Sequence, residues 1–568
     1  MTIHMKKNVK ALLYVSSAAL LVSSCDLMKD AEYKVTPNPL EMHGDSVRIT
    51  ATVTFPEKGI HKKAKAEITP MLGNTALKTI TVLGEKATGN GNTVKYKSGG
   101  TVTYKDVVAY KPEYENADLM VTGKVYKGAK EKETIDPFKI ADATIITPLL
   151  VKKDYKVIMQ DDNFQRVTEE VMKAQINFDK AKSNLRPKEM KDADIKALEA
   201  WLAAAETDPK KTIKSINIIG YASPEGEVGR NVSLSSDRSA TAKEAIMNLA
   251  KKANNTKAQS EIYNLSGRGE DYDGFKVELE KSTMDNEEKQ LVIRVLEMYK
   301  DPVQRETEMR NMAKTFVYLD KNIFPLLRRA EIHVVYDQTG HTDEELLALA
   351  KSTPDSLNVE ELLFTATLMD DLNDKKALYQ NGTITFPKDI RIHNNLGAVL
   401  YKQGKYDEAA ARFESANGLE DNAVSKNNLG AIEGMKGNRS KAKELFSQAG
   451  GAGSEVNYNQ GILNIMDGKY PEAVSNLGSE ASFNKGLAQV LNGNPDAGSQ
   501  TVGESMDKDS ALGYYLKAIA AARMDKIDQV ASNLKNAFAK DGSYKAKAAK
   551  DREFLKYYDN PTFSDIVK

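Results

Sequence analysis

The sequence of 568 residues predicts a multidomain protein: an all-β sandwich, then an α/β domain, then an all-α solenoid of helical repeats. Three observations predict this order. Apolar and polar residues alternate in the first part, strand-like and helix-like patterns alternate in the middle part, and a short unit recurs in the last part. These patterns place the three domains at residues 35–154, 155–340 and 341–568.

The N-terminus has the pattern of a secretory signal peptide. Lys6, Lys7 and Lys10 give a basic start, and residues 11–22 then form a run that is almost entirely apolar or small. This run is too short to span a bilayer as a permanent helix. We therefore expect a signal segment here rather than a transmembrane anchor.

A cysteine closes this segment. Val-Ser-Ser at 22–24 leads directly into Cys25, the only cysteine of the chain. This ending resembles the lipobox of bacterial lipoproteins. The resemblance implies that residues 1–24 are removed, that Cys25 then carries acyl chains such as palmitate, and that residues 25–34 form a tether behind the lipid. The alternative is a plain signal peptide followed by a chance cysteine.

The composition excludes several kinds of partner. The formal net charge is zero, and loss of the signal removes three lysines and no acidic residue, so the mature chain is slightly acidic. A nucleic-acid-binding protein would need a basic face, so we expect no nucleic acid partner. After Cys25 there is no long apolar run, which predicts membrane attachment through the lipid. The six histidines have no spacing typical of a metal site, and we expect no metal and no cofactor.

Strand-like alternation dominates residues 35–151. The clearest run has five apolar residues at alternate positions: Val47, Ile49, Ala51, Val53 and Phe55. Turn clusters rich in Pro, Gly and Asn separate such runs, which is typical of a β-sandwich. We expect this domain to act as a spacer or a docking module.

Strand and helix patterns alternate in the middle part. A period of two marks strands at 174–178, 216–220 and 332–336, and helical spacing marks 195–205 and 242–249. Such alternation predicts an α/β layer.

This α/β part carries a motif. A turn Gly-Tyr-Ala-Ser-Pro-Glu-Gly at 220–226 is followed by a helix start Asn-x-x-Leu-Ser-x-x-Arg, with Ser235 as the expected N-cap. The helix start is formed by Asn231, Leu234, Ser235 and Arg238. With a later Gly-x-Gly turn and an arginine-led closing strand, these residues resemble the OmpA-like domain, a module that binds peptidoglycan. The resemblance covers about residues 175–336.

The resemblance implies a wall-binding site. Family members hold the diaminopimelate group of the peptidoglycan stem peptide between an arginine, matched by Arg238, and an aspartate. The aspartate position falls on Ser223, which supplies no charge, so Glu225 would have to hold the ammonium, beside Asn231. A charged, helix-patterned insertion at 271–324 would reshape or cover this site. The alternatives are that Arg238 supports the fold by pairing with a local acid, and that Ser223 belongs to a structural turn.

A helical unit recurs in the last part. Gly397, Gly430 and Gly461 each follow Asn-x, an alanine comes twelve residues later, and a large apolar residue comes four further on. This pattern resembles the tetratricopeptide repeat, in which small residues let paired helices approach closely. Weaker units are expected at 362–379, 484–486 and 513–538.

One asparagine per repeat is expected to line the concave groove of this solenoid: Asn395, Asn428, Asn459 and Asn484. An asparagine has both a donor and an acceptor and can pair with a main-chain amide. We therefore expect the groove to bind an extended peptide of an envelope protein. The alternative is that these asparagines hydrogen-bond between helices, and the lysines and arginines of the family's carboxylate clamp are not present in full.

The chain carries no hydrolase, metalloprotease or phosphate-binding motif, which predicts a non-enzymatic protein. The leading hypothesis is an outer-membrane lipoprotein facing the periplasm, which contacts peptidoglycan through its OmpA-like domain and recruits a protein partner through its repeats. The alternative is an adaptor of an envelope secretion, fimbria or outer-membrane assembly complex whose OmpA-like domain no longer binds the wall. A third hypothesis, an envelope hydrolase, would need a charged cleft with perturbed carboxylates.

Overall fold

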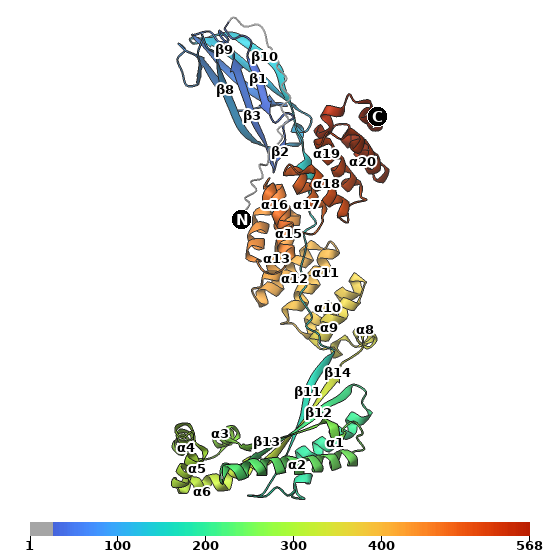
Figure 1. Ribbon diagram of the computed structural model, residues 1–568. Helices are drawn as coiled ribbons and strands as arrows, with labels where there is room; N and C mark the ends of the chain where they lie inside the picture. The colour runs from blue at the N-terminus through green and yellow to red at the C-terminus, as the bar shows by residue number, and fades with distance from the viewer. Residues whose placement is uncertain (1–26) are drawn as a thin grey trace, which may run out of the picture. The chain divides into compact units, whose positions relative to one another are not determined.

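The computed structural model describes residues 27–568, so the predicted signal segment and Cys25 lie outside the described residues. The chain divides into two compact units (Figure 1). Of the described residues, the first unit contains 27–161 and Asp371–Lys568, and the second contains Asp162–Asp370. Within the described residues, no helix is both long enough and apolar enough to cross a membrane.

The first unit begins with two sheets that enclose one core. The smaller sheet has the order β1-β3-β2, and β8 also pairs with β3. Its strands are β1 (Glu32–Thr36), β2 (Met42–His43), β3 (Ser46–Phe55) and β8 (Gly100–Ala109). The larger sheet has the order β10-β9-β4-β6-β7, with β5 paired to β4. Its strands are β4 (Ala64–Leu72), β5 (Thr75–Ala76), β6 (Ile80–Gly84), β7 (Asn92–Val94), β9 (Asp118–Lys127) and β10 (Lys130–Asp142).

The alternation in the sequence explains this packing. All five alternate apolar residues of β3 are buried, and they share a core with Ile68 of β4 and Val121 of β9 from the other sheet. Side chains alternate between the two faces of a strand, so one face of β3 builds the core while the other carries polar residues. The predicted β-rich N-terminal region is therefore confirmed.

A segment without regular secondary structure follows the sandwich. After the short helix η2 (Thr147–Leu150), residues 151–161 form an extended stretch that we call the strap. It belongs to the same unit as the repeats. The change of period near Tyr155 assigns residues 155–161 to the α/β domain, but they belong to the first unit. A local pattern does not record which distant helices a segment contacts.

Antiparallel helix pairs form the rest of the first unit (Figure 1). The helices are α10 (Leu372–Thr385), α11 (Ile390–Lys402), α12 (Tyr406–Leu419), α13 (Ala423–Lys436), α14 (Arg439–Gln448), α15 (Ser454–Met466), α16 (Tyr470–Asn476), α17 (Phe483–Leu491), α18 (Pro495–Glu504), α19 (Ala511–Arg523) and α20 (Ile527–Lys540). They are followed by α21 (Ser543–Ala548), η6 (Arg552–Tyr557) and α22 (Pro561–Val567). This arrangement confirms the predicted tetratricopeptide-like repeats.

The recurring glycines make these pairs possible. A Cβ atom on Gly397 would lie 2.6 Å from the ring of Phe413, and one on Gly430 would lie 2.7 Å from the ring of Phe446. Heavy atoms cannot approach so closely, so the first helix of each pair needs glycine where the large residue of the second helix packs. Gly461 likewise makes room for Leu477, because a Cβ atom on Gly461 would lie 2.6 Å from Leu477 Cγ.

The second unit contains a four-stranded sheet of order β11-β14-β12-β13. Its strands are β11 (Val167–Asn177), β12 (Lys211–Ala222), β13 (Tyr263–Glu270) and β14 (Arg329–Thr339). Only β12 and β13 are parallel to each other. Helices α1 (Ala193–Thr207) and α2 (Val228–Lys252) share one core with the sheet, as the predicted α/β layer requires.

Helix α2 begins earlier than the sequence predicted. It starts at Val228, so Ser235 lies inside the helix and is not its N-cap. The Ser235 hydroxyl is buried, donates to the carbonyl of Val232 at 2.8 Å and accepts the N–H of Gly269 at 2.9 Å. The sequence does not distinguish the two roles of Ser235, because a serine that bonds to a neighbouring strand has the same local sequence as a capping serine.

The insertion folds into five helices with a core of their own. They are α3 (Tyr272–Lys281), α4 (Asn286–Met298), α5 (Pro302–Asn311), α6 (Lys314–Asn322) and α7 (Phe324–Leu327). Asp271, Asp285 and Asp301 each accept a main-chain N–H in the first turn of the helix that follows them. Phe275 and Phe324 pack edge to face in the middle of this core. Helices α8 (Asp343–Ser352) and α9 (Val359–Leu368) complete the unit.

Candidate functional site

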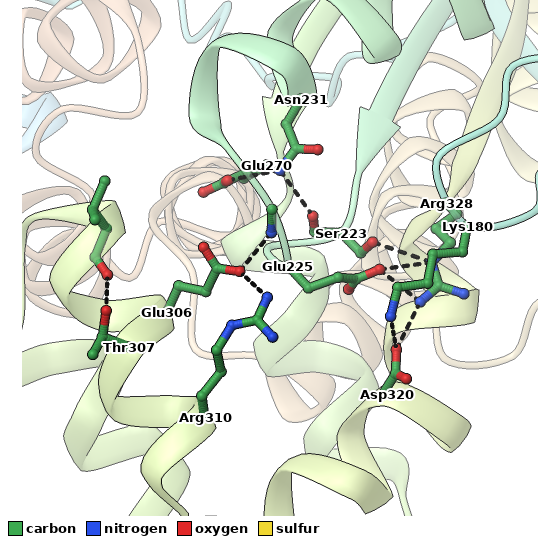
Figure 2. Close-up of polar contacts among 12 residues, drawn as sticks. Lys180, Ser223, Glu225, Asn231, Glu270, Glu306, Thr307, Arg310, Asp320 and Arg328 are labelled. Atoms are coloured by element: carbon green, nitrogen blue, oxygen red, sulfur yellow. Dashed lines mark hydrogen bonds and ion pairs between the residues drawn. The ribbon is translucent and has the colours of Figure 1, made fainter.

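The turn between β12 and α2 holds a buried ion pair (Figure 2). The guanidinium of Arg328 donates to Glu225 Oε1 at 3.0 and 2.6 Å and to the hydroxyl of Ser223 at 3.2 Å. The Glu225 side chain is 4% exposed and that of Arg328 is 8% exposed. Burial raises the pKa of Glu225, while the charge of Arg328 opposes that rise. Glu225 thus already has a cationic partner from its own chain.

The helical insertion covers the same turn. Glu306 of α5 accepts the main-chain N–H of Gly226 at 2.6 Å, and Asp320 of α6 accepts from Arg328 at 3.1 Å and from Lys180 at 2.8 Å. Figure 2 shows these carboxylates reaching the turn from the insertion helices. Glu225 Oε1 and the N–H of Gly226 are therefore already bonded within the protein, while Glu225 Oε2 is buried without a hydrogen-bond partner.

Asn231 also bonds within this network. Its side-chain amide donates to the carbonyl of Ser223 at 3.3 Å and to Glu270 Oε1 at 2.9 Å. The residue is buried, and its two contacts join the start of α2 to the turn and to the end of β13. This geometry is typical of a residue that fixes a turn.

Arg238 lies beneath the turn and is 1% exposed. Its guanidinium donates to the carbonyls of Tyr221 at 2.8 Å, Asp179 at 3.1 Å and Lys182 at 3.1 Å. It also lies over the ring of Phe178, with 5.5 Å between Cζ and the ring centroid. Burial, together with the nearby charge of Arg328, lowers the pKa of Arg238 to about 10. All three guanidinium nitrogens donate to main-chain carbonyls, and none of these bonds is to a side-chain carboxylate.

The predicted groove asparagines come together along the strap. Each one accepts the N–H of one strap residue and donates to the carbonyl of that same residue. Asn484 pairs in this way with Lys152 at 2.9 and 2.9 Å, and Asn459 pairs with Lys156 at 2.7 and 2.8 Å. An amide side chain that pairs with both groups of one residue repeats the contact made between two β-strands.

The other two asparagines continue the series. Asn428 pairs with Ile158 at 2.7 and 2.8 Å, and Asn395 pairs with Gln160 at 2.8 and 2.9 Å. The four asparagines therefore form a ladder that binds main-chain groups of this protein's own strap. The sequence predicted the groove and its chemistry, but not this occupant.

A second row of asparagines, missed in the sequence, supports the ladder. Asn394 donates to the carbonyl of Ile158 at 3.0 Å, and Asn427 donates to that of Lys156 at 3.1 Å. Their side-chain oxygens accept from Asn428 at 2.9 Å and from Asn459 at 3.0 Å. The asparagines therefore also form hydrogen bonds between helices, which was the alternative to peptide binding. The signal was the Asn-Asn dipeptide that occurs in two successive repeats.

Tyr155 anchors the middle of the strap. It is 3% exposed, and its ring is stacked on Phe446 with 6.1 Å between ring centroids. A Cβ atom on Gly434 would lie 2.6 Å from Tyr155 Cζ, so this helical glycine makes room for the ring. The hydroxyl of Tyr401 donates to the carbonyl of Tyr155 at 2.9 Å.

Charged side chains flank this anchor. Lys152 pairs with Asp507 at 2.9 Å, and the ammonium of Lys156 lies 4.3 Å from the centroid of the Tyr458 ring. The hydroxyl of Tyr458 donates to Asp154 at 3.0 Å. The groove thus combines contacts to the strap main chain with a small number of contacts to its side chains.

Within the described residues, no group of three or more His, Asp or Glu side chains could hold a metal ion. Cys25, the predicted lipid-bearing residue, lies outside the part of the chain that the structure describes.

Solved structures of repeat proteins resemble the chain at low identity. A tetratricopeptide repeat protein from Parabacteroides merdae matches at 16% identity over 46% of this chain and 96% of its own, with a TM-score of 0.28. The C-terminal part of a TPR repeat-containing protein from Cytophaga hutchinsonii matches at 16% identity over 40% of this chain and 92% of its own, with a TM-score of 0.26.

A structure of the APC/C hetero-tetramer Cut9–Hcn1 matches at 12% identity over 40% of this chain, with a TM-score of 0.32, and the match spans 45% of that chain. These TM-scores are too low to carry an argument, so the repeat architecture rests on the helix pairs themselves. No protein family and no curated protein matches the chain.

Proposed function

We propose that this protein is a non-enzymatic scaffold, anchored in the outer membrane by a lipid on Cys25 and facing the periplasm, which recruits an envelope protein through its repeats. Its OmpA-like domain acts in this proposal as a structural and protein-interaction module rather than as a wall tether. The adaptor hypothesis is thus preferred over the peptidoglycan-binding one.

The arrangement of Arg238 carries this preference. A ligand carboxylate would have to replace three hydrogen bonds that the buried guanidinium donates to main-chain carbonyls, and each bond to a charged group contributes about 1.5–3 kcal/mol. Glu225, the candidate for holding an ammonium, would also have to leave Arg328. A preformed diaminopimelate site would instead present these two groups unpaired to solvent.

A non-enzymatic role is consistent with the pairing of the buried ionisable groups. The buried Arg328 is paired with Glu225, and Arg329 contacts Asp271 at 2.7 Å. In the first unit Arg523 contacts Glu553 at 2.5 Å. Catalytic acids and bases need an accessible cleft and a pKa near the working pH, and these paired groups lie inside the packed units.

Sedimentation with purified peptidoglycan sacculi tests the adaptor role. We expect the unlipidated full chain to stay in the supernatant. The control variant Arg230→Ala, which changes an exposed arginine of α2, should behave in the same way. Sedimentation of the wild type, lost in Glu225→Gln but kept in Arg230→Ala, would establish the wall tether and exclude the adaptor proposal.

Membrane fractionation tests the anchor. We expect the full-length protein to incorporate labelled palmitate and to separate with outer membranes, and a Cys25→Ser variant to lose both properties. Membrane association that persists without lipid incorporation would contradict the lipid anchor.

A further inference from the structure

The peptide-binding groove of the repeats is filled by the protein itself. Four asparagines from α11, α13, α15 and α17 use both the donor and the acceptor of their amide groups on strap residues. Asn394 and Asn427 add further bonds to the same main chain. An external peptide therefore finds the groups that would bind its backbone already engaged.

The chemistry of these contacts is largely independent of sequence. The ladder binds mainly N–H and C=O groups, which every non-proline residue supplies. Asn484 in addition donates to the carboxylate of strap residue Asp154 at 2.8 Å. Side-chain recognition is concentrated at Tyr155, in the space left by Gly434, with Lys152 and Lys156 contacting Asp507 and the Tyr458 ring. Another extended segment that has an aromatic residue at the Tyr155 position and lysines nearby would satisfy the same groups.

We propose that the strap is an exchangeable intramolecular ligand that keeps the groove closed, and that the partner of the repeats carries an extended segment with an aromatic anchor and flanking basic residues that displaces it. Covalent attachment gives the strap an effective concentration on the order of millimolar or higher, so a free peptide of equal chemistry cannot compete at micromolar concentration. A partner must bind a second surface as well, or the strap must first be weakened. This inference rests on the proposed recruitment of a protein by the repeats.

Binding of a strap peptide tests the exchange. A fluorescently labelled peptide of residues 151–161 is titrated onto the full-length, unlipidated protein and followed by fluorescence anisotropy. We expect no binding to the wild type at micromolar concentration. We expect binding to Ile158→Pro, because proline lacks the N–H that Asn428 accepts and weakens the strap without changing the groove.

Two further variants make the test specific. Lys153→Pro changes an exposed strap residue that no ladder asparagine contacts, so the groove should stay closed. Adding Asn428→Ala and Asn459→Ala to Ile158→Pro should reduce peptide affinity at least tenfold. Equal binding to the wild type and to Ile158→Pro, or no binding to a folded Ile158→Pro protein, overturns the proposal.

Hydrogen exchange provides a second measurement that does not depend on the proline variant. In the wild type we expect the amides of Lys156 and Ile158 to be protected, and in Asn428→Ala/Asn459→Ala we expect that protection to be lost while the helices stay protected. Unprotected amides in the wild type would overturn the proposal. If no peptide displaces the strap but a partner is still recruited through the repeats, only the inference about the strap is wrong. The proposed scaffold function then still stands.

Discussion

At the scale of single residues, small and buried side chains decide what each part of the chain can pack against. Gly397 and Gly434 both lie in first helices of repeats, but the first makes room for Phe413 and the second for Tyr155 of the strap. The buried Arg238 likewise joins the carbonyl of Tyr221, near the end of β12, to those of Asp179 and Lys182 in the loop after β11.

Gly397→Ala should destabilise the first unit by about 1–3 kcal/mol, because the new methyl group overlaps the Phe413 ring in a packed interface. The matched control is Gly418→Ala in α12, where a Cβ atom meets nothing within 4 Å. That substitution should be neutral or stabilising by up to about 1 kcal/mol. Urea unfolding followed by circular dichroism measures both, and equal effects would refute the packing argument.

Arg238→Ala should lower the stability of the second unit by about 3 kcal/mol or more, since it removes three hydrogen bonds made by a buried guanidinium. Arg230→Ala, on an exposed position of the same helix, should change stability by less than about 0.5 kcal/mol. Thermal unfolding compares the two variants. A fully stable Arg238→Ala protein would mean that this arginine does not support the fold.

At the scale of elements, segments far apart in sequence hold each other in place. The short strand β2 meets α16: the ring of His43 packs edge to face on that of Tyr470, with 4.9 Å between ring centroids. The hydroxyl of Tyr470 accepts the main-chain N–H of Gly44 at 3.3 Å. The strap is a second example, because an element without regular structure becomes ordered through the side chains of a helical groove.

The partly buried contact of His43 predicts that the stability of the first unit depends on pH. Burial, with the charge of Arg48 nearby, lowers the pKa of His43 below its ordinary value of 6.5. The unfolded chain then binds the proton more readily, so stability falls as the pH drops below about 6.5 towards the folded pKa. A His43→Phe variant should keep the ring contact and lose less stability than the wild type between pH 7.5 and 5.5. Identical losses in urea unfolding at the two pH values would rule out a contribution from His43.

At the scale of the whole molecule, the cores are separate. The sandwich and the repeats have cores within the first unit, and the sheet and the insertion have cores within the second. Inside the first unit, Arg523 of α19 contacts both Glu553 of η6 at 2.5 Å and Glu41 beside β2 at 3.0 Å. Breaking a buried charge pair is costly, so the contact with Glu553 should hold η6 to α19.

Residues 162–370 should therefore fold on their own. We expect this fragment to unfold cooperatively with a sigmoidal urea transition and to retain the helix and strand content of the second unit. A full chain in which these residues are replaced by a Gly-Ser linker should keep the strap protected from hydrogen exchange. A fragment without a cooperative transition would show that the second unit depends on the first.

The sequence by itself determined the order of the folds and much of the groove. Alternation in β3, the recurring glycines and alanines, and the asparagines at one helix position are local patterns, and each reports the face on which a side chain lies. The helical insertion at 271–324 was predictable for the same reason.

Only the tertiary structure decided what those faces contact. Asn395 and Asn428 have the same local sequence whether they bind an external peptide or the strap, and Arg238 has the same helix position whether it faces a ligand or three carbonyls. A periodic pattern records which side of an element is buried, but not which distant segment covers it. The occupant of the groove and the partners of Arg238 depend on how the chain folds back on itself, because hydrogen-bonding groups accept any partner that the fold brings within reach.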